Sequence, residues 1–184
     1  MRKKIVIIGS VNTKGEQLKF LKQKIEERGH QAVLMDISMG GSPPFEADIT
    51  PKEIASLVGK DINDIIASND RFDITNSMTR GAEQKTLDLL SKKELDGIVS
   101  LGGSTIALLG SRVMSRLPFG IPKVIAVPAA QAVYISQWFG ANDSVVMQLI
   151  MEIAGMNDLI KNAISQVAGA ISGMVEPSAR QRCA

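Results

Sequence analysis

The apolar residues of this chain form two kinds of pattern that follow one another along the sequence. Short continuous apolar runs predict buried strands at 4–9, 31–37, 97–101 and 122–128. Apolar residues at helical spacing predict longer helices at 15–28, 76–92, 104–116 and 157–175. Residues 144–153 fit a strand or a helix, and their β-branched residues together with Gly155 favour a strand. This alternation predicts an α/β fold: a Rossmann-like, doubly wound, mainly parallel sheet in a three-layer arrangement.

Local signals set several boundaries between these elements. Gly29 is placed to end the first helix, and the glycines and prolines of 38–49 indicate a loop. Thr50, Pro51 and Glu53 match a helix start with a capping box, which predicts a short helix to about Val58. A second short helix is expected at 61–67, with Asp61 at its start. Within the helix at 76–92, Asp88 can pair with Lys92.

Length and composition suit a single domain. The chain has 184 residues, of which 45% are hydrophobic, so we expect one domain over 1–176. Residues 177–184 carry no pattern and are expected to be a disordered tail or a truncated linker to an absent second domain. The lone cysteine, Cys183, excludes a disulfide framework or a cysteine zinc site within one chain.

Charge and hydropathy indicate which binding partners and which cellular location to expect. The net charge is +2 with no basic stripe, which argues against nucleic acid. The first apolar run is too short for a signal peptide, and the uncharged stretch 124–142 contains a proline and several amides, so we expect no membrane span and a cytoplasmic protein. His30 is predicted to lie on the surface. Trp138 is predicted to be a core or interface anchor.

A glycine turn after the third strand is the clearest candidate for a binding site. Gly102, Gly103, Ser104 and Thr105 connect that strand directly to a helix. A helix N-terminus carries unpaired N–H groups and partial positive charge, and glycine lets an anion approach the backbone. The turn therefore predicts a phosphate site. The alternative is that Ser104 simply caps the helix and the glycines make the turn.

Polar residues after the first two strands lie at the same sheet edge. Asn12, Thr13, Lys14 and Gly15 follow the first strand but match neither the phosphate loop nor the dinucleotide fingerprint. Lys14 could neutralise a phosphate, or it could be a solvated lysine at a helix start. Asp36 ends the second strand, where an acid commonly meets ribose hydroxyls; the alternative is an N-cap or turn residue. No catalytic set or metal-ligand cluster is visible, so the catalytic residues stay unknown and no metal site is predicted.

Five ordered motifs resemble a known family. They are VNTKGEQ (11–17), FEADITPKEIA (45–55), LDGIVSLGGS (95–104), LPFGIPKVIAV (117–127) and IAGMND (153–158). In order and spacing they are similar to the N-terminal domain of uncharacterised protein family 0261, the Tm-one-like ATP-binding proteins. The resemblance implies a Rossmann-like domain that binds ATP on its βα loops, and a second α/β domain further along the chain. This chain departs from the family pattern at three loops. Asn12 stands where the family usually has aspartate, the glycine loop is shorter, and residues 128–131 offer fewer hydroxyl groups.

Three hypotheses follow. The first is a module that binds a nucleotide or other phosphate-bearing small molecule, above all ATP with or without Mg²⁺. The second is an interaction domain that kept the fold and lost the ligand. The third is one half of an enzyme completed by a separate second-domain protein. Whether the chain is an enzyme stays open. Because a missing domain would uncover apolar surface, chiefly in residues 133–156, we also expect a homo-oligomer or a complex with such a second-domain protein.

Overall fold

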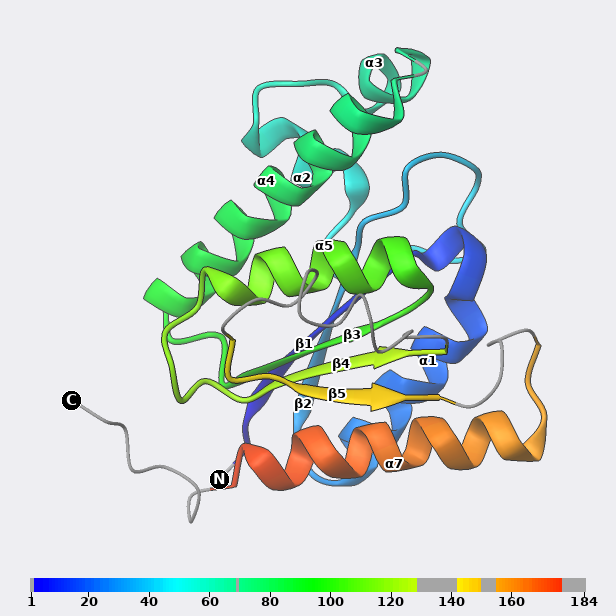
Figure 1. Cartoon of the computed structure of the whole chain (residues 1–184), viewed down its shortest axis with the longest axis vertical. Helices are drawn as coiled ribbons and strands as arrows, with labels where there is room; N and C mark the ends of the chain where they lie inside the picture. The colour runs from blue at the N-terminus through cyan, green and yellow to red at the C-terminus, as the bar shows by residue number, and fades with distance from the viewer. Residues whose placement is uncertain (1, 69, 129–141, 150–154, 177–184) are drawn as a thin grey trace.

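The computed structural model describes residues 2–68, 70–128, 142–149 and 155–176. Five strands form one sheet in the order β2-β1-β3-β4-β5, and every pairing in it is parallel (Figure 1). The strands are β1 (Lys4–Gly9), β2 (Gln31–Asp36), β3 (Gly97–Leu101), β4 (Lys123–Val127) and β5 (Val145–Gln148). The parallel sheet is confirmed, and β5 confirms a strand within 144–153.

Helices cover both faces of this sheet (Figure 1). On one face, α1 (Val11–Glu27) and α7 (Asp158–Met174) share an apolar core with β1 side chains such as Ile5 and Ile7. On the other face, Val6 and Ile8 lie in a core with α2 (Pro51–Leu57), α3 (Ile62–Ala67), α4 (Arg71–Ser91) and α5 (Ser104–Ser115). Alternate side chains of one strand enter opposite cores, as the pleat requires. The three-layer, Rossmann-like α/β fold is confirmed.

The two short helices predicted from their capping residues are confirmed as α2 and α3. The Thr50 hydroxyl accepts the N–H of Glu53 at 3.2 Å, and Asp61 caps α3 through the N–H of Asn63. Within α4, the Lys92–Asp88 pair forms at 2.8 Å.

Two helices begin earlier than the apolar spacing predicts. The structure starts α1 at Val11 rather than at residue 15, with non-helical dihedral angles at Lys14, so Asn12 and Thr13 lie in a first helical turn and not in a loop. It starts α4 at Arg71 rather than at residue 76, because Asp70 caps it by accepting the N–H groups of Phe72 and Asp73. In both cases hydrogen-bond acceptors for the first N–H groups set the start of the helix: Asp36 and Ser38 for α1, and Asp70 for α4. The spacing of apolar residues does not reveal such acceptors.

His30 is buried, not on the surface as predicted. It is 8% exposed, and its Nδ1 has no hydrogen-bond partner in the part of the chain that the structure describes. Gly29, at a φ of +85°, ends the turn after α1, and His30 directly precedes β2, where Lys3, Asp96 and Glu176 are the charged groups that act on it. Burial lowers the pKa of His30, since it disfavours the charged form.

Charged groups at the amino ends of the strands pair with one another. Lys3 lies 3.6 Å from Asp96, and the fully buried Lys123 donates to Asp143 at 2.5 Å and to the Pro118 carbonyl at 2.9 Å. Burial works against ionisation of Asp143, but the bonds from Lys123 and from the Gly120 N–H outweigh it and hold the pKa of Asp143 below its usual value. The charges of Lys3 and Lys123 at this end of the sheet are therefore paired with carboxylates of the same chain.

Several predictions fall on residues outside the described ranges. These are the anchor Trp138, most of the surface at 133–156, the loop after β4 at 129–131, and the tail at 177–184. Among the helices that the structure describes, none is long and apolar enough to cross a membrane.

Candidate functional site

The strand order places a topological switch point between β1 and β3. β1 pairs with β2 on one side and with β3 on the other, and the helices that follow β1 and β3 lie on opposite faces. In open parallel sheets of this order, ligands bind outside the carboxyl ends of the strands at such a point. Two turns flank it here: the Ser10 turn (residues 10–14) after β1, and the Gly103 turn (residues 102–106) after β3.

The Ser10 turn is closed by hydrogen bonds within the protein. The N–H of Val11 donates to Asp36 Oδ1 at 3.0 Å, and the N–H of Asn12 donates to the Ser38 hydroxyl at 3.3 Å. The next two N–H groups, of Thr13 and Lys14, both donate to the Ser10 carbonyl. The first N–H groups of α1 are therefore used, and an anion would find no backbone donor there.

The Gly103 turn is open. Gly103 is the N-cap of α5, and among the described residues no side chain caps the helix, so the alternative that Ser104 caps it is wrong. Ala107 is the first residue of α5 whose N–H bonds back, to the Gly103 carbonyl at 3.0 Å. Within the described residues, the N–H groups of Ser104, Thr105 and Ile106 have no acceptor. Both hydroxyl-bearing residues are also exposed.

The two glycines of this turn serve different purposes. A Cβ on Gly102 would lie 2.7 Å from the Cβ of Ile106, so the absence of a side chain lets α5 begin close to β3. A Cβ on Gly103 would meet no atom of the described residues within 4 Å. Gly102 is needed for packing, whereas Gly103 faces open space.

A cleft of about 870 Å³ lies between the two turns and α4, and we call it the switch-point cleft. Its polar lining includes Asn12, Thr13, Lys14, Arg71 and Thr75 together with Gly103, Ser104 and Thr105. Its apolar lining is formed by Ile37, Met39, Ile66, Ile74 and Ile106. The described lining contains two cationic side chains and no carboxylate.

The structure thus brings six of the nine predicted site residues together. These are Asn12, Thr13, Lys14, Gly103, Ser104 and Thr105. It does not bring Gly15 there: Gly15 is buried, and a Cβ on it would lie 2.8 Å from Pro44, so it lets the loop at 42–47 pack on α1. Gly102 is buried within the Gly103 turn, and neither it nor Asp36 lines the cleft.

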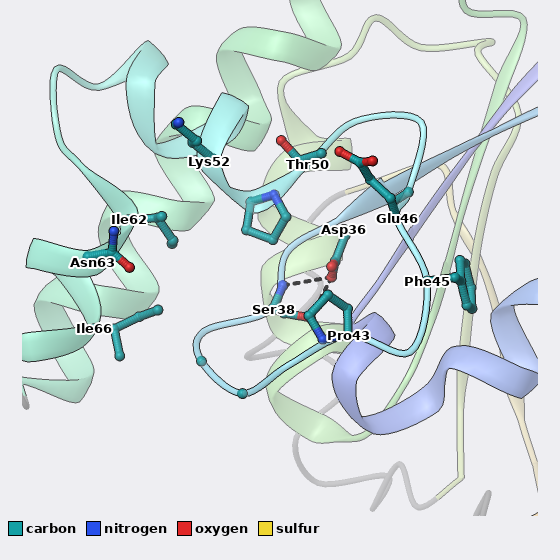
Figure 2. A pocket seen from close by; sticks show the side chains of 14 residues that line it. Asp36, Ser38, Pro43, Phe45, Glu46, Thr50, Lys52, Ile62, Asn63 and Ile66 are labelled. Atoms are coloured by element: carbon teal, nitrogen blue, oxygen red, sulfur yellow. Dashed lines mark hydrogen bonds between the residues drawn. The ribbon is translucent and has the colours of Figure 1, made fainter.

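Asp36 is 1% exposed and holds the Ser10 turn. Its Oδ1 accepts the N–H of Val11, and also the N–H and the hydroxyl of Ser38 at 2.9 and 2.5 Å. These contacts support its reading as a turn residue. Asp36 also lines a second cleft of about 480 Å³, where Figure 2 shows it beside Ser38 and Pro43. A contact between Asp36 and a ribose stays a prediction.

The loop after β2 separates the two clefts. Gly40 and Gly41 line both, with φ values of +130° and +77° that favour glycine. The Asn12 side chain fixes this loop, because its Nδ2 donates to the Gly40 carbonyl. Its Oδ1 accepts from the Ser10 hydroxyl at 2.5 Å.

Sequence reasoning missed Arg71 and Thr75, because the helix was expected to begin at residue 76. The signal that could have found them is Asp70 followed three residues later by Asp73, the spacing of a helix N-terminus with an acidic first turn. No group of three or more potential metal-ligating side chains occurs in the part of the chain that the structure describes.

Several known proteins are similar to this chain in sequence. Residues 3–180 match the description "Uncharacterised protein family (UPF0261) N-terminal domain". A UPF0261 protein of Clostridium tetani is 34% identical over 97% of this chain and 44% of its own length, and one of Brucella suis is 30% identical over 92% and 41%. The ToMV susceptible protein tm-1 of Solanum lycopersicum is 27% identical over 94% of this chain and 25% of its own length.

The chain therefore spans less than half the length of the relatives it matches. The family match covers nearly all of this chain, including both turns of the switch point. The chain belongs to uncharacterised protein family UPF0261 and corresponds to its N-terminal domain.

Proposed function

We propose that this chain binds a nucleotide, ATP, in the switch-point cleft, with its phosphates at the amino end of α5. One observation carries the proposal: three successive N–H groups at the start of α5 have no acceptor among the described residues, and they open onto this cleft. Such an end attracts anions through both its N–H groups and its partial positive charge.

The charges and shape of the cleft support the same ligand. Lys14 and Arg71 line it without any described carboxylate, a balance that favours a polyanion over a cation. Five apolar side chains form the remainder of its wall and suit a base or another flat apolar group. Its volume of about 870 Å³ falls in the range of small-molecule sites.

The departure at Asn12 from the usual family residue fits this proposal as well. The Asn12 amide donates to the Gly40 carbonyl, which a carboxylate could not do. Asn12 therefore helps to hold Gly40 in the wall of the cleft.

Calorimetric titration with ATP, with and without Mg²⁺, tests the proposal on the parent and on Gly103→Val. A Cβ at this position would meet no described atom within 4 Å, so we expect the larger side chain to extend into the space at the start of α5 and hinder the approach of a phosphate. We expect the parent to bind and Gly103→Val to lose measurable binding while keeping its fold. The matched control is Gly173→Val in α7, where a Cβ also meets no atom within 4 Å.

The proposal fails if the parent does not bind ATP under either condition. If Gly103→Val binds as tightly as the parent, the nucleotide site lies elsewhere.

A further inference from the structure

Within the proposed function, we propose that Arg71 of α4 is a second phosphate-binding cation and makes the cleft selective for nucleoside di- and triphosphates over monophosphates. The inference rests on the nucleotide site proposed above. It adds a residue from outside the sheet edge and a chemical class of ligand.

Arg71 belongs to the face of α4 that lines the cleft. Arg71, Ile74 and Thr75 all line it, and the spacing i, i+3, i+4 places them on one side of the helix. Ile74 is buried beneath the exposed Arg71, and Thr75 is half-buried. The apolar contact of Ile74 therefore fixes this face of α4 toward the cleft.

The acids nearest to Arg71 along the chain are committed to other donors. Asp70 accepts the N–H groups of Phe72 and Asp73 as the helix cap. The Asp73 carboxylate receives both of its short bonds, each 2.8 Å, from Lys60. Of the described side chains, none forms an ion pair with Arg71. The counter-ion of its guanidinium is left to solvent or to a ligand.

Arg71 and Lys14 reach the cleft from separate elements. Lys14 comes from the kinked first turn of α1 at the sheet edge, and Arg71 comes from the end of α4 near α3, which stands away from the sheet in Figure 1. A single phosphate on the α5 terminus can engage that terminus and one neighbour. A chain of two or three phosphates can engage both cations, and a guanidinium can hold two of its oxygens at once.

The experiment titrates the full chain with ATP, ADP, AMP and inorganic tripolyphosphate by calorimetry. The variants are Arg71→Gln and Arg71→Lys, and the matched control is Arg80→Gln. Arg80 lies on the same helix and is exposed, but it is nine residues from Arg71, half a turn round the helix, and does not line the cleft.

For Arg71→Gln we expect affinity for ATP and tripolyphosphate to fall by about 10- to 100-fold, the effect of losing a charge-assisted bond. Affinity for AMP should change by less than about twofold, since its single phosphate is already held at α5. Arg71→Lys should recover part of the loss, because it keeps the charge but not the two-pronged geometry. Arg80→Gln should bind like the parent.

The outcomes distinguish failure of the Arg71 proposal from failure of the proposed nucleotide binding. If the parent binds none of the four compounds, both fail. If the parent binds ATP and Arg71→Gln binds it equally well, the cleft remains a nucleotide site but Arg71 has no part in it. An equal loss for AMP and ATP would also overturn the selectivity, because Arg71 would then contact the first phosphate. Thermal unfolding of each variant shows whether a loss reflects the fold.

Discussion

The turns after β1 and β3 sit side by side at the sheet edge and use their backbone in opposite ways. In the Ser10 turn, buried Asp36, Ser38 and the Ser10 carbonyl accept the first four N–H groups of α1. In the Gly103 turn, no described side chain caps α5, and three N–H groups are left without an acceptor. The Ser10 turn therefore offers a ligand only side chains, whereas the Gly103 turn offers its backbone.

The comparison separates residues that shape a site from residues that contact a ligand. Asp36 and Gly15 match a ligand-site pattern in sequence, yet their contacts here are with the protein's own backbone and with Pro44 and Phe45. Buried polar groups are normally hydrogen-bonded. An exposed helix start without a cap is thus more informative about a ligand than a buried acid at a strand end.

The largest expected effect is on the closed turn. Asp36→Ala removes the acceptor of three bonds from Val11 and Ser38 and should lower the free energy of unfolding by at least about 3 kcal/mol, since buried donors left unpaired cost about 1–3 kcal/mol each. Urea unfolding followed by circular dichroism measures the loss.

Asp36→Asn retains an oxygen acceptor and should lose less than Asp36→Ala. Glu26→Ala, on the exposed face of α1, serves as the control and should leave stability within about 0.5 kcal/mol. A fully stable Asp36→Ala would mean that the Ser10 turn is not held by this carboxylate.

The next effect concerns the side chain that the closed turn contributes. If Lys14 contacts a phosphate, Lys14→Ala should weaken ATP binding by about 1.5–3 kcal/mol, and the difference should shrink as salt rises. Titration at low and high ionic strength, set beside Gly103→Val, tests whether the two turns act differently. An unchanged dissociation constant at low salt would return Lys14 to the solvated-surface reading.

The smallest expected effect separates the two glycines of the open turn. Gly102→Val forces a side chain against Ile106 and should cost about 1–3 kcal/mol of stability by overpacking, whereas Gly103→Val should stay within about 0.5 kcal/mol. Chemical denaturation of the pair is the measurement. Equal losses would show that both glycines serve packing, which would weaken the ligand reading of the turn.

The sequence predicts the helices that have one apolar face. It also predicts that the Ser10 turn and the Gly103 turn lie at the same edge of the sheet. The spacing of Leu18, Leu21 and Ile25 predicts α1, and all three are buried. The start of α1 could not be read, because its donors are accepted by Asp36 and Ser38, which lie 25 and 26 positions further along the chain. Hydrophobic periodicity carries no information about an acceptor supplied by a neighbouring strand.

The candidate site divides in the same way. Gly103, Ser104 and Thr105 could be predicted because a strand, a glycine pair and a helix are contiguous in the sequence. Arg71 was missed, because its place in the cleft depends on the start of α4, which Asp70 marks, and on the packing of Ile74, which the sequence does not give. The burial of His30 was missed for a related reason: its surroundings come from the sheet and not from its neighbours in sequence.

The pairing of β1 with β3 has a consequence for when the cleft can exist. The strands are adjacent in the sheet, and the N–H of Lys4 bonds Asp96 across 92 positions of chain. Closing so long a loop is a slow, entropically costly step, and the Ser10 turn, Arg71 and the Gly103 turn meet only once it is complete. In a partly folded chain without this pairing, the Ser10 turn, the Gly103 turn and Arg71 would not lie close together. Any ligand of this cleft would therefore bind the finished fold alone and stabilise it in proportion to the logarithm of its concentration.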